Sequence, residues 1–135
     1  MENNEKGESV KVVTLDSMNL IGCDFLKIDV EGMELNVLKG AKKLITQHRP
    51  KIYAEADREE KFKDLYKYLI SIDYRVFLHL PPIYNPNNYF KNPEDIFGNM
   101  VSVNILCIPK EMDVTLQGFP EITMENYNEI AKKIF

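Results

Sequence analysis

The sequence predicts an α/β fold, in which strands alternate with helices. Two runs rich in β-branched and apolar residues, 25–30 and 51–56, predict short strands. Each run is followed by a segment whose apolar residues recur every three or four positions, which is the spacing of a helix with one buried face. Because parallel strands need crossover connections of this kind, the two strand–helix units predict a largely parallel sheet with helices on its faces.

The first half of the chain predicts these elements in order. Residues 10–15 form a short β-branched run that ends at Asp16, a residue type common at helix N-caps, so we expect a strand that leads into a turn or a helical turn. The strand over 25–30 follows, and then a one-sided helix over 33–45. Pro50 ends that helix, because the residue before a proline disfavours helical backbone.

The second half continues with a helix over 62–70 and two further strands, at 74–80 and 102–108. A loop of about 20 residues, 81–100, separates these strands; it exceeds the usual loop length, so we expect it to be functional or mobile. No helical pattern lies between the two strands. We therefore expect a sheet of about four strands with an antiparallel C-terminal edge, followed by a helix over 124–134.

Length and composition indicate one domain and exclude several classes of protein. With 135 residues, 44% of them apolar, the chain can bury one core. Its 17 basic and 21 acidic side chains give a net charge of -4 and no basic stripe, so nucleic acid is not an expected partner. No apolar run is long enough to cross a bilayer, and residues 1–9 are polar, so we expect a cytoplasmic protein that does not bind membranes.

Cysteine and histidine do not predict a metal site. Cys23 and Cys107 are far apart in the sequence, and neither has a cysteine or histidine neighbour at metal-ligand spacing. We expect reduced thiols in or near the core rather than a disulfide. His48 and His79 are isolated in sequence, and no metal is predicted.

Acidic residues gather where the predicted strands end, which is where open α/β sheets bind their ligands. Asp29 is next to last in the strand over 25–30, Glu31 starts the turn that follows it, and Glu55 ends the next strand. Lys27 shares a strand face with Asp29, because side chains alternate with period two. These groups would hold an amine or hydroxyl, or take a proton from a nucleophile. The alternative is structural: Lys27 pairs with Asp29 or Glu55, and Glu31 complements the dipole of the next helix.

Three stretches between Val13 and Glu55 carry a family resemblance. They are V-T-L-D-S, D-F-L-K-I-D-V-E-G-M-E-L-N-V-L-K-G-A and R-P-K-I-Y-A-E. Together they resemble the central part of the FkbM family of S-adenosylmethionine (SAM)-dependent methyltransferases. The most diagnostic part is I-D-V-E-G-M-E followed by V-L-K-G-A. Residues 10–135 thus resemble the C-terminal portion of a methyltransferase domain, after a flexible N-terminus over residues 1–9.

The resemblance implies a fold and a reaction. The fold is the seven-stranded, Rossmann-like class I methyltransferase sheet, in which the strand over 25–30 is the fourth. The reaction is methyl transfer from SAM to an oxygen of a sugar or natural product. Asp29 and Glu31 are the implied catalytic residues, with Asp29 activating the acceptor hydroxyl. Glu31 or Glu55 would orient the substrate, and Lys27 and Glu55 would belong to the substrate-binding set.

The same resemblance implies a SAM site that this sequence lacks. Class I methyltransferases hold SAM through a glycine-rich turn after the first strand and an acid that ends the second. Here no two of the six glycines are closer than eight positions, so that turn cannot be built. We expect a truncated or split enzyme that is inactive by itself, because the SAM-binding segment is missing.

The edge of the predicted sheet and the long loop suggest partners. In the family fold the fourth strand pairs with the first, so an uncovered edge over 25–30 would be a template for another chain. We expect Leu26, Ile28 and Val30 to be covered by residues 10–15, by a second copy or by a separate polypeptide. Tyr84 and Tyr89 in the loop are candidate substrate-binding residues of a lid over a sugar-like acceptor.

A second function is open at this stage. A non-catalytic remnant or binding module would keep the sheet and use its acidic strand ends or its aromatic loop to hold a glycan or protein. An α/β subunit that serves assembly alone is a third interpretation. An upstream reading frame that encodes a glycine-rich turn would favour the split or truncated enzyme.

Overall fold

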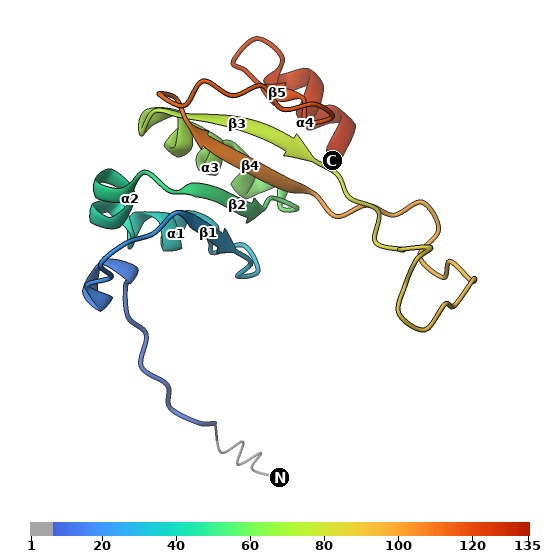
Figure 1. Cartoon of the computed structure of the whole chain (residues 1–135), viewed down its shortest axis with the longest axis horizontal. Coiled ribbons are helices and arrows are strands. Elements are labelled where there is room, and N and C mark those ends of the chain that lie inside the picture. Colours follow the sequence, from blue (N-terminus) through green and yellow to red (C-terminus); the bar gives the residue numbers. More distant parts are fainter. Residues whose placement is uncertain (1–6) are drawn as a thin grey trace.

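The computed structural model describes residues 7–135 and contains one mixed five-stranded sheet, in the order β1-β2-β4-β3-β5 (Figure 1). Only β1 and β2 are parallel, and every other neighbouring pair is antiparallel. The α/β class predicted from the sequence is confirmed, but the expectation of a largely parallel sheet of about four strands was wrong, because three of the four neighbouring pairs are antiparallel and the sheet has five strands. The strands are β1 (Phe25–Ile28), β2 (Lys51–Glu55), β3 (Tyr74–His79), β4 (Asn104–Pro109) and β5 (Glu121–Ile122).

The position of the last long strand differs from the prediction. β4 is antiparallel, as expected, but it lies inside the sheet between β2 and β3 instead of at the edge. The connection through α3 (Glu59–Ser71) places β3 one strand position away from β2. β4 lies in the position between them and forms hydrogen-bonded ladders with both β2 and β3. The C-terminal edge is β5, two residues long, which the sequence did not predict.

The predicted helix over 33–45 is in fact two short helices, α1 (Glu34–Lys39) and α2 (Lys42–His48). The chain turns at Gly40, where a Cβ atom would lie 3.3 Å from the Thr14 side chain, so glycine lets the N-terminal segment approach. Asp16 caps α2: its carboxylate accepts hydrogen bonds from the backbone N–H groups of Lys43 (2.9 Å) and Leu44 (3.0 Å). These backbone bonds lower the pKa of Asp16.

The predicted strand over residues 10–15 is absent. Residues 10–14 have no regular structure, and Val10 and Val12 are 74% and 88% exposed. A 3-10 helix, η1 (Leu15–Met18), follows them. β-Branched residues favour extended backbone, but a strand also needs a partner ladder. Residues 10–15 therefore do not cover Leu26, Ile28 and Val30, and that part of the expectation for the sheet edge was wrong.

The helices pack on one face of the sheet, not on both as predicted, and Figure 1 shows α1 and α3 behind the strands. The buried cluster joins this sheet face to all four α-helices, including α4 (Tyr127–Ile134), which begins three residues later than predicted. On the other face, the loop after β4 contacts β3: the Val114 carbonyl accepts a hydrogen bond from Arg75. The residues of the buried sheet face include Ile28, Ile52, Ala54, Val76, Leu78, Ile105 and Cys107.

The remaining segments agree in part with the sequence. Residues 81–100 form an irregular loop, pinned at its base by a bridge between Pro82 and Val101, and it extends away from the sheet (Figure 1). Cys23 and Cys107 are free thiols, and Cys107 is fully buried. Of the N-terminal residues predicted to be flexible, 1–6 lie outside the described residues. Among residues 7–135, no helix is long and apolar enough to cross a membrane.

Candidate functional site

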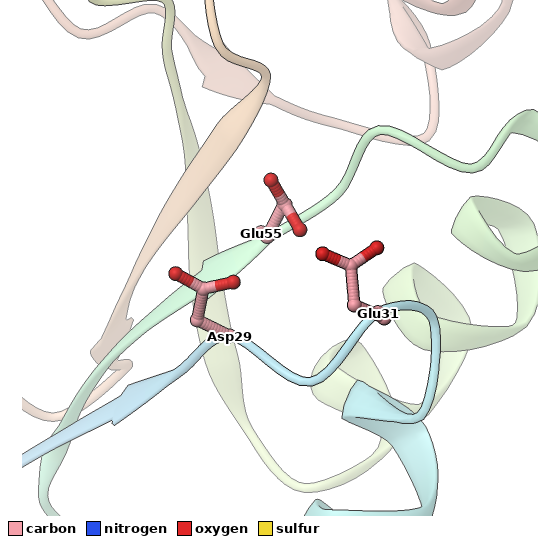
Figure 2. A group of neighbouring side chains, drawn as sticks. All are labelled: Asp29, Glu31 and Glu55. Atoms are coloured by element: carbon pink, nitrogen blue, oxygen red, sulfur yellow. The ribbon is translucent and has the colours of Figure 1, made fainter.

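Three carboxylates converge at the carboxyl ends of the two parallel strands. Asp29 directly follows β1, Glu31 lies in the turn beyond it, and Glu55 is the last residue of β2. Because β1 and β2 run in the same direction, their carboxyl ends meet at one edge of the sheet. One oxygen of each side chain lies within 4.8 Å of the others, and Figure 2 shows all three carboxylates on the same side of the chain. These residues form the acidic cluster.

The backbone after β1 bends sharply to place Glu31 in this cluster. Glu31 and Gly32 both have left-handed backbone, with φ values of 51° and 84°. Left-handed backbone costs about 1 kcal/mol or more for a residue with a side chain, so Glu31 is held there by its surroundings. The turn is closed by a hydrogen bond of 2.9 Å from the Gly32 N–H to the carboxylate of Glu34, the buried first residue of α1.

Two of the three acids have a cationic partner. The Lys27 ammonium lies 3.2 Å from Asp29, which is the pairing that the structural alternative predicted. The Arg58 guanidinium lies 2.8 Å from Glu31 and 3.4 Å from Asp57. The negative charge of Asp57 and the hydrogen bond to Glu31 raise the pKa of Arg58. The sequence did not identify Arg58 as part of this site, although it lies only three residues beyond β2.

Glu55 has the most distinctive electrostatic environment of the three acids. Burial raises the pKa of its carboxyl group, and the charges of Asp57, Asp29 and Glu31 raise it further. Among residues 7–135, no ion pair includes Glu55. Glu55 therefore takes up a proton more readily than an ordinary glutamate, which suits a group that exchanges protons with a ligand.

A tyrosine–histidine pair lies on the same face of the sheet as Glu55. The Tyr53 hydroxyl is 2.8 Å from Nδ1 of His79, and the His79 ring packs on Phe119 at 4.8 Å between centroids. The register sets Glu55 opposite Asn104 and Asn104 opposite His79, so these three residues form one row. Because side chains alternate along a strand, Tyr53 lies on the same face of β2 as Glu55, and this alternation could have identified Tyr53 from the sequence. The contact with His79 depends on the strand order, which the sequence did not give.

The loop tyrosines occupy different environments from the acidic cluster. The Tyr84 hydroxyl donates a hydrogen bond of 2.9 Å to the Asn92 carbonyl and so ties two parts of the loop together. Tyr89 is 91% exposed, and its ring meets that of Phe90, which is 87% exposed, edge to face at 5.2 Å. Tyr89 therefore remains free to contact a ligand, whereas the hydroxyl of Tyr84 has a structural partner.

The acidic cluster does not by itself specify a metal ion. Three carboxylates offer the oxygen donors that Mg²⁺ and Ca²⁺ prefer. Asp29 and Glu31, however, are already paired with Lys27 and Arg58, and both acids are exposed. The described residues support binding of a hydroxyl or amine at least as well as binding of a cation.

Comparison with known proteins identifies the family. This α/β protein, with acids at the carboxyl ends of parallel strands, has the arrangement of a ligand-binding open sheet. Residues 2–76 match the family model of the methyltransferase FkbM domain, which is more than half of the chain, so the protein belongs to this family. No curated protein sequence and no solved structure has significant similarity to the chain.

The matched segment contains the whole acidic cluster. It extends from the N-terminus through β1, β2 and α3 and ends within β3. β4, β5 and α4 lie beyond the match. The family points to a methyltransferase-like function, and methyltransferases in general take the methyl group from SAM.

Proposed function

We propose that this chain contributes the acceptor side of an FkbM-type, SAM-dependent O-methyl transfer, in which the acceptor is a hydroxyl group of a sugar or natural product. The family match and the convergence of the acidic cluster support this proposal. Carboxylates at the mouth of a sheet bind hydroxyl groups well, because each oxygen accepts hydrogen bonds.

The arrangement of the strands is consistent with the class I methyltransferase sheet. β1 would be the fourth of its seven strands, so β1 to β4 would be the fourth to the seventh. In that case the four strands must be neighbours, and they are consecutive in the observed order β1-β2-β4-β3.

The described residues do not fit SAM. Among them Gly32 is the one glycine in the turn that follows a strand, and it lies beyond Asp29, Val30 and Glu31 after the end of β1. Its N–H already donates to Glu34, and the place of a Cβ atom is filled by the Lys61 amine at 2.5 Å. The turn therefore offers no open backbone cradle. We propose that SAM is held by residues other than these.

The charges of the acidic cluster suggest a division of roles. Asp29 and Glu31 are neutralised by Lys27 and Arg58, and as carboxylates they would accept hydrogen bonds from neighbouring hydroxyls of the acceptor. Glu55 has no such partner within residues 7–135, and its pKa is raised. We therefore assign proton removal to Glu55, where the sequence suggested Asp29. The proton of the reacting hydroxyl passes to a Glu55 carboxylate oxygen.

Beyond the family match, the single observation on which the assigned roles rest is the approach of the three carboxylates to within 4.8 Å. The test uses an FkbM methyltransferase that carries both the I-D-V-E-G motif and a glycine-rich turn. Replacing the glutamate equivalent to Glu55 with glutamine should lower kcat by about a hundredfold or more, because general-base catalysis contributes on that scale. Replacing the aspartate equivalent to Asp29 with asparagine should mainly raise KM for the acceptor.

Two results would contradict these roles. If the Glu55-equivalent variant keeps nearly wild-type kcat at every pH, that carboxylate does not take the proton. If the Asp29-equivalent variant binds acceptor normally and loses kcat instead, the roles are reversed and the sequence-based assignment holds. Calorimetric titration of the present chain with SAM should show no binding, and tight binding would refute the proposal that SAM is held elsewhere.

A glycan- or protein-binding module without catalysis is the alternative function. The observation that favours it is the exposed Tyr89–Phe90 pair, since exposed aromatic side chains are common in recognition sites. In that case replacing both aromatic residues with alanine would abolish ligand binding, whereas Glu55→Gln would leave it unchanged. In the methyltransferase, the change equivalent to Glu55→Gln lowers kcat by about a hundredfold or more.

A further inference from the structure

Three polar side chains form a row across the central strands, at the edge of the sheet where the acidic cluster lies. Glu55 ends β2, His79 ends β3, and Asn104 begins the antiparallel strand β4 between them. The register sets Asn104 opposite both other residues, so all three side chains lie on the same face. Figure 2 shows the Glu55 carboxylate, where this polar row meets the acidic cluster. Open α/β sheets bind their ligands at this edge.

Each member of the polar row has a polar group that is available to a ligand. The Asn104 amide donates from Nδ2 to the Ser102 hydroxyl at 2.8 Å, which leaves its oxygen Oδ1 free. His79 uses Nδ1 toward the Tyr53 hydroxyl and leaves Nε2 free. Within residues 7–135, the Glu55 carboxylate has no ion-pair partner, and no buried side-chain nitrogen or oxygen lacks a hydrogen bond. The free groups of the polar row are therefore open to solvent.

Two neighbours fix the His79 ring and its proton. Tyr53 reaches over β4 from β2 to bond Nδ1, and Phe119 packs against the ring. Burial raises the pKa of Tyr53, so its hydroxyl keeps its proton and donates it to Nδ1. A neutral histidine that accepts a hydrogen bond at Nδ1 carries its own proton on Nε2. His79 therefore presents a fixed N–H donor to the edge of the sheet.

The spacing of the polar row matches a six-membered ring. Neighbouring strands are about 4.8 Å apart, so Glu55 and His79 lie roughly 10 Å apart across β4. A hydrogen bond of about 2.8 Å at each end leaves about 4–5 Å between two ligand oxygens. Hydroxyl groups on alternate carbons of a sugar ring have this separation. The hydroxyl on the carbon between them then faces Asn104.

From this geometry we propose that the polar row binds three consecutive hydroxyl groups of a cyclic polyol, such as a sugar ring. Glu55 contacts the first hydroxyl, Asn104 Oδ1 accepts from the second, and His79 donates from Nε2 to the third. Tyr53 is a positioning residue, because it acts through His79. The ring is neutral, since the acidic cluster repels anions. The identity of the first hydroxyl as the reacting group rests on the proposed function, whereas binding of the ring does not.

Nuclear magnetic resonance of the chain with 15N-labelled histidine tests this proposal. The sequence has two histidines, and His48 in α2 is an internal control for His79. The probe is myo-inositol, a six-membered ring with a hydroxyl on every carbon, at about pH 8, where an ordinary histidine is neutral. It should shift the Nε2 signal of His79 and leave His48 unchanged. trans-1,2-Cyclohexanediol lacks the third hydroxyl and should not shift that Nε2 signal.

Four variants separate ligand contact from structure, with affinity followed by the backbone amide signals of β4. His79→Leu should bind myo-inositol about fivefold or more weakly, because it loses one hydrogen bond. His79→Gln can place an amide N–H near the position of Nε2 and should bind within about twofold of wild type. Tyr53→Phe should weaken binding and move the Nδ1 signal of His79 toward that of an unbonded ring. Lys51→Gln, a change on the same face of β2 but at its other end, should have no effect.

The proposal is overturned if myo-inositol leaves the His79 signal unmoved, if His48 responds equally, or if His79→Leu binds as tightly as wild type. Circular dichroism verifies that each variant keeps its fold. Failure here is distinct from failure of the proposed function. Lost turnover in the Glu55-equivalent variant without any response of His79 refutes only the polar row. A response of His79 together with full turnover in that variant refutes only the assigned proton transfer.

Discussion

Replacing Arg49 with methionine should destabilise the fold by about 2–3 kcal/mol, because this side chain joins three turns. Arg49 ends α2, and its guanidinium donates to the carbonyls of Ile72 and Asp73 at 2.9 Å each. It also forms two hydrogen bonds to the Glu111 carboxylate, at 2.7 and 2.8 Å. Its centre lies 4.6 Å above the Tyr74 ring. Methionine keeps an apolar stem over that ring and removes every donor.

The magnitude follows from these contacts. The part-buried bond to Ile72 and the exposed bond to Asp73 together contribute about 1.5 kcal/mol. The cation–π contact adds roughly 0.5 kcal/mol. Glu111 has a side chain that is 56% exposed, so its ion pair contributes only about 0.5–1 kcal/mol after screening by solvent. For a domain of this size, the sum corresponds to a fall in Tm of roughly 10 °C.

The effect should also depend on pH. The hydrogen bond from Arg49 lowers the pKa of Glu111 from its ordinary value of 4.5 to about 2. A lowered pKa in the folded state means that the ion pair stabilises fully above pH 4.5 and that this part is lost as the pH falls toward 2. The difference between wild type and Arg49→Met should therefore shrink over that window.

Urea unfolding of wild type, Arg49→Met and the control Glu111→Gln measures these contributions. Glu111→Gln should cost about 0.5–1 kcal/mol, well below the cost of Arg49→Met. If the two variants are equally destabilised, the ion pair and not the carbonyl bonds holds the turns together. If Arg49→Met unfolds within about 0.5 kcal/mol of wild type, the reasoning is refuted.

Three further predictions concern the core. Tyr74→Phe should lower the free energy of unfolding by about 1–2 kcal/mol in urea titrations, because the buried hydroxyl donates to the Pro50 carbonyl at 2.8 Å. In the wild type, burial raises the pKa of Tyr74 to about 12, so the ultraviolet absorbance of this residue should titrate at higher pH than that of exposed tyrosines. Ile105→Ala, at a fully buried position of β4, should cost about 3 kcal/mol by the same measurement, and a loss below about 1 kcal/mol would contradict the central position of that strand. A thiol reagent should label half-buried Cys23 in the native protein and Cys107 only after unfolding, since burial raises the pKa of the Cys107 thiol and blocks access.

Local periodicity predicted the main elements but not their limits. The four longer strands were predicted within a few residues because each has a proline or glycine near one end, and the helix over Glu59–Ser71 was predicted because its apolar residues have a clear helical period. The break at Gly40 was missed because the helical period continues across it. β5 is too short to show any period, and the β-branched run over 10–15 has no partner ladder.

The part of the candidate site that follows from the parallel direction of β1 and β2 could be predicted from the sequence. Asp29, Glu31 and Glu55 were expected together because parallel strands end at one edge, and the structure brings them together. Arg58, which pairs with Glu31, and the His79 ring beside Tyr53 were missed, because both contacts depend on how distant segments fold back. The long-range strand order carries that information.

The insertion of β4 between β2 and β3 makes the fold strongly cooperative. Without it, β1 and β2 would share no backbone ladder with β3 and β5, and the two parts of the chain would be joined only by helix packing and by side-chain bonds such as that from Tyr74 to Pro50. The strand that unites them lies about fifty residues from β2 along the sequence, and closing so large a loop is entropically costly and slow. We therefore expect these two parts to remain loosely associated during refolding until β4 docks, and to lose their structure together when it detaches.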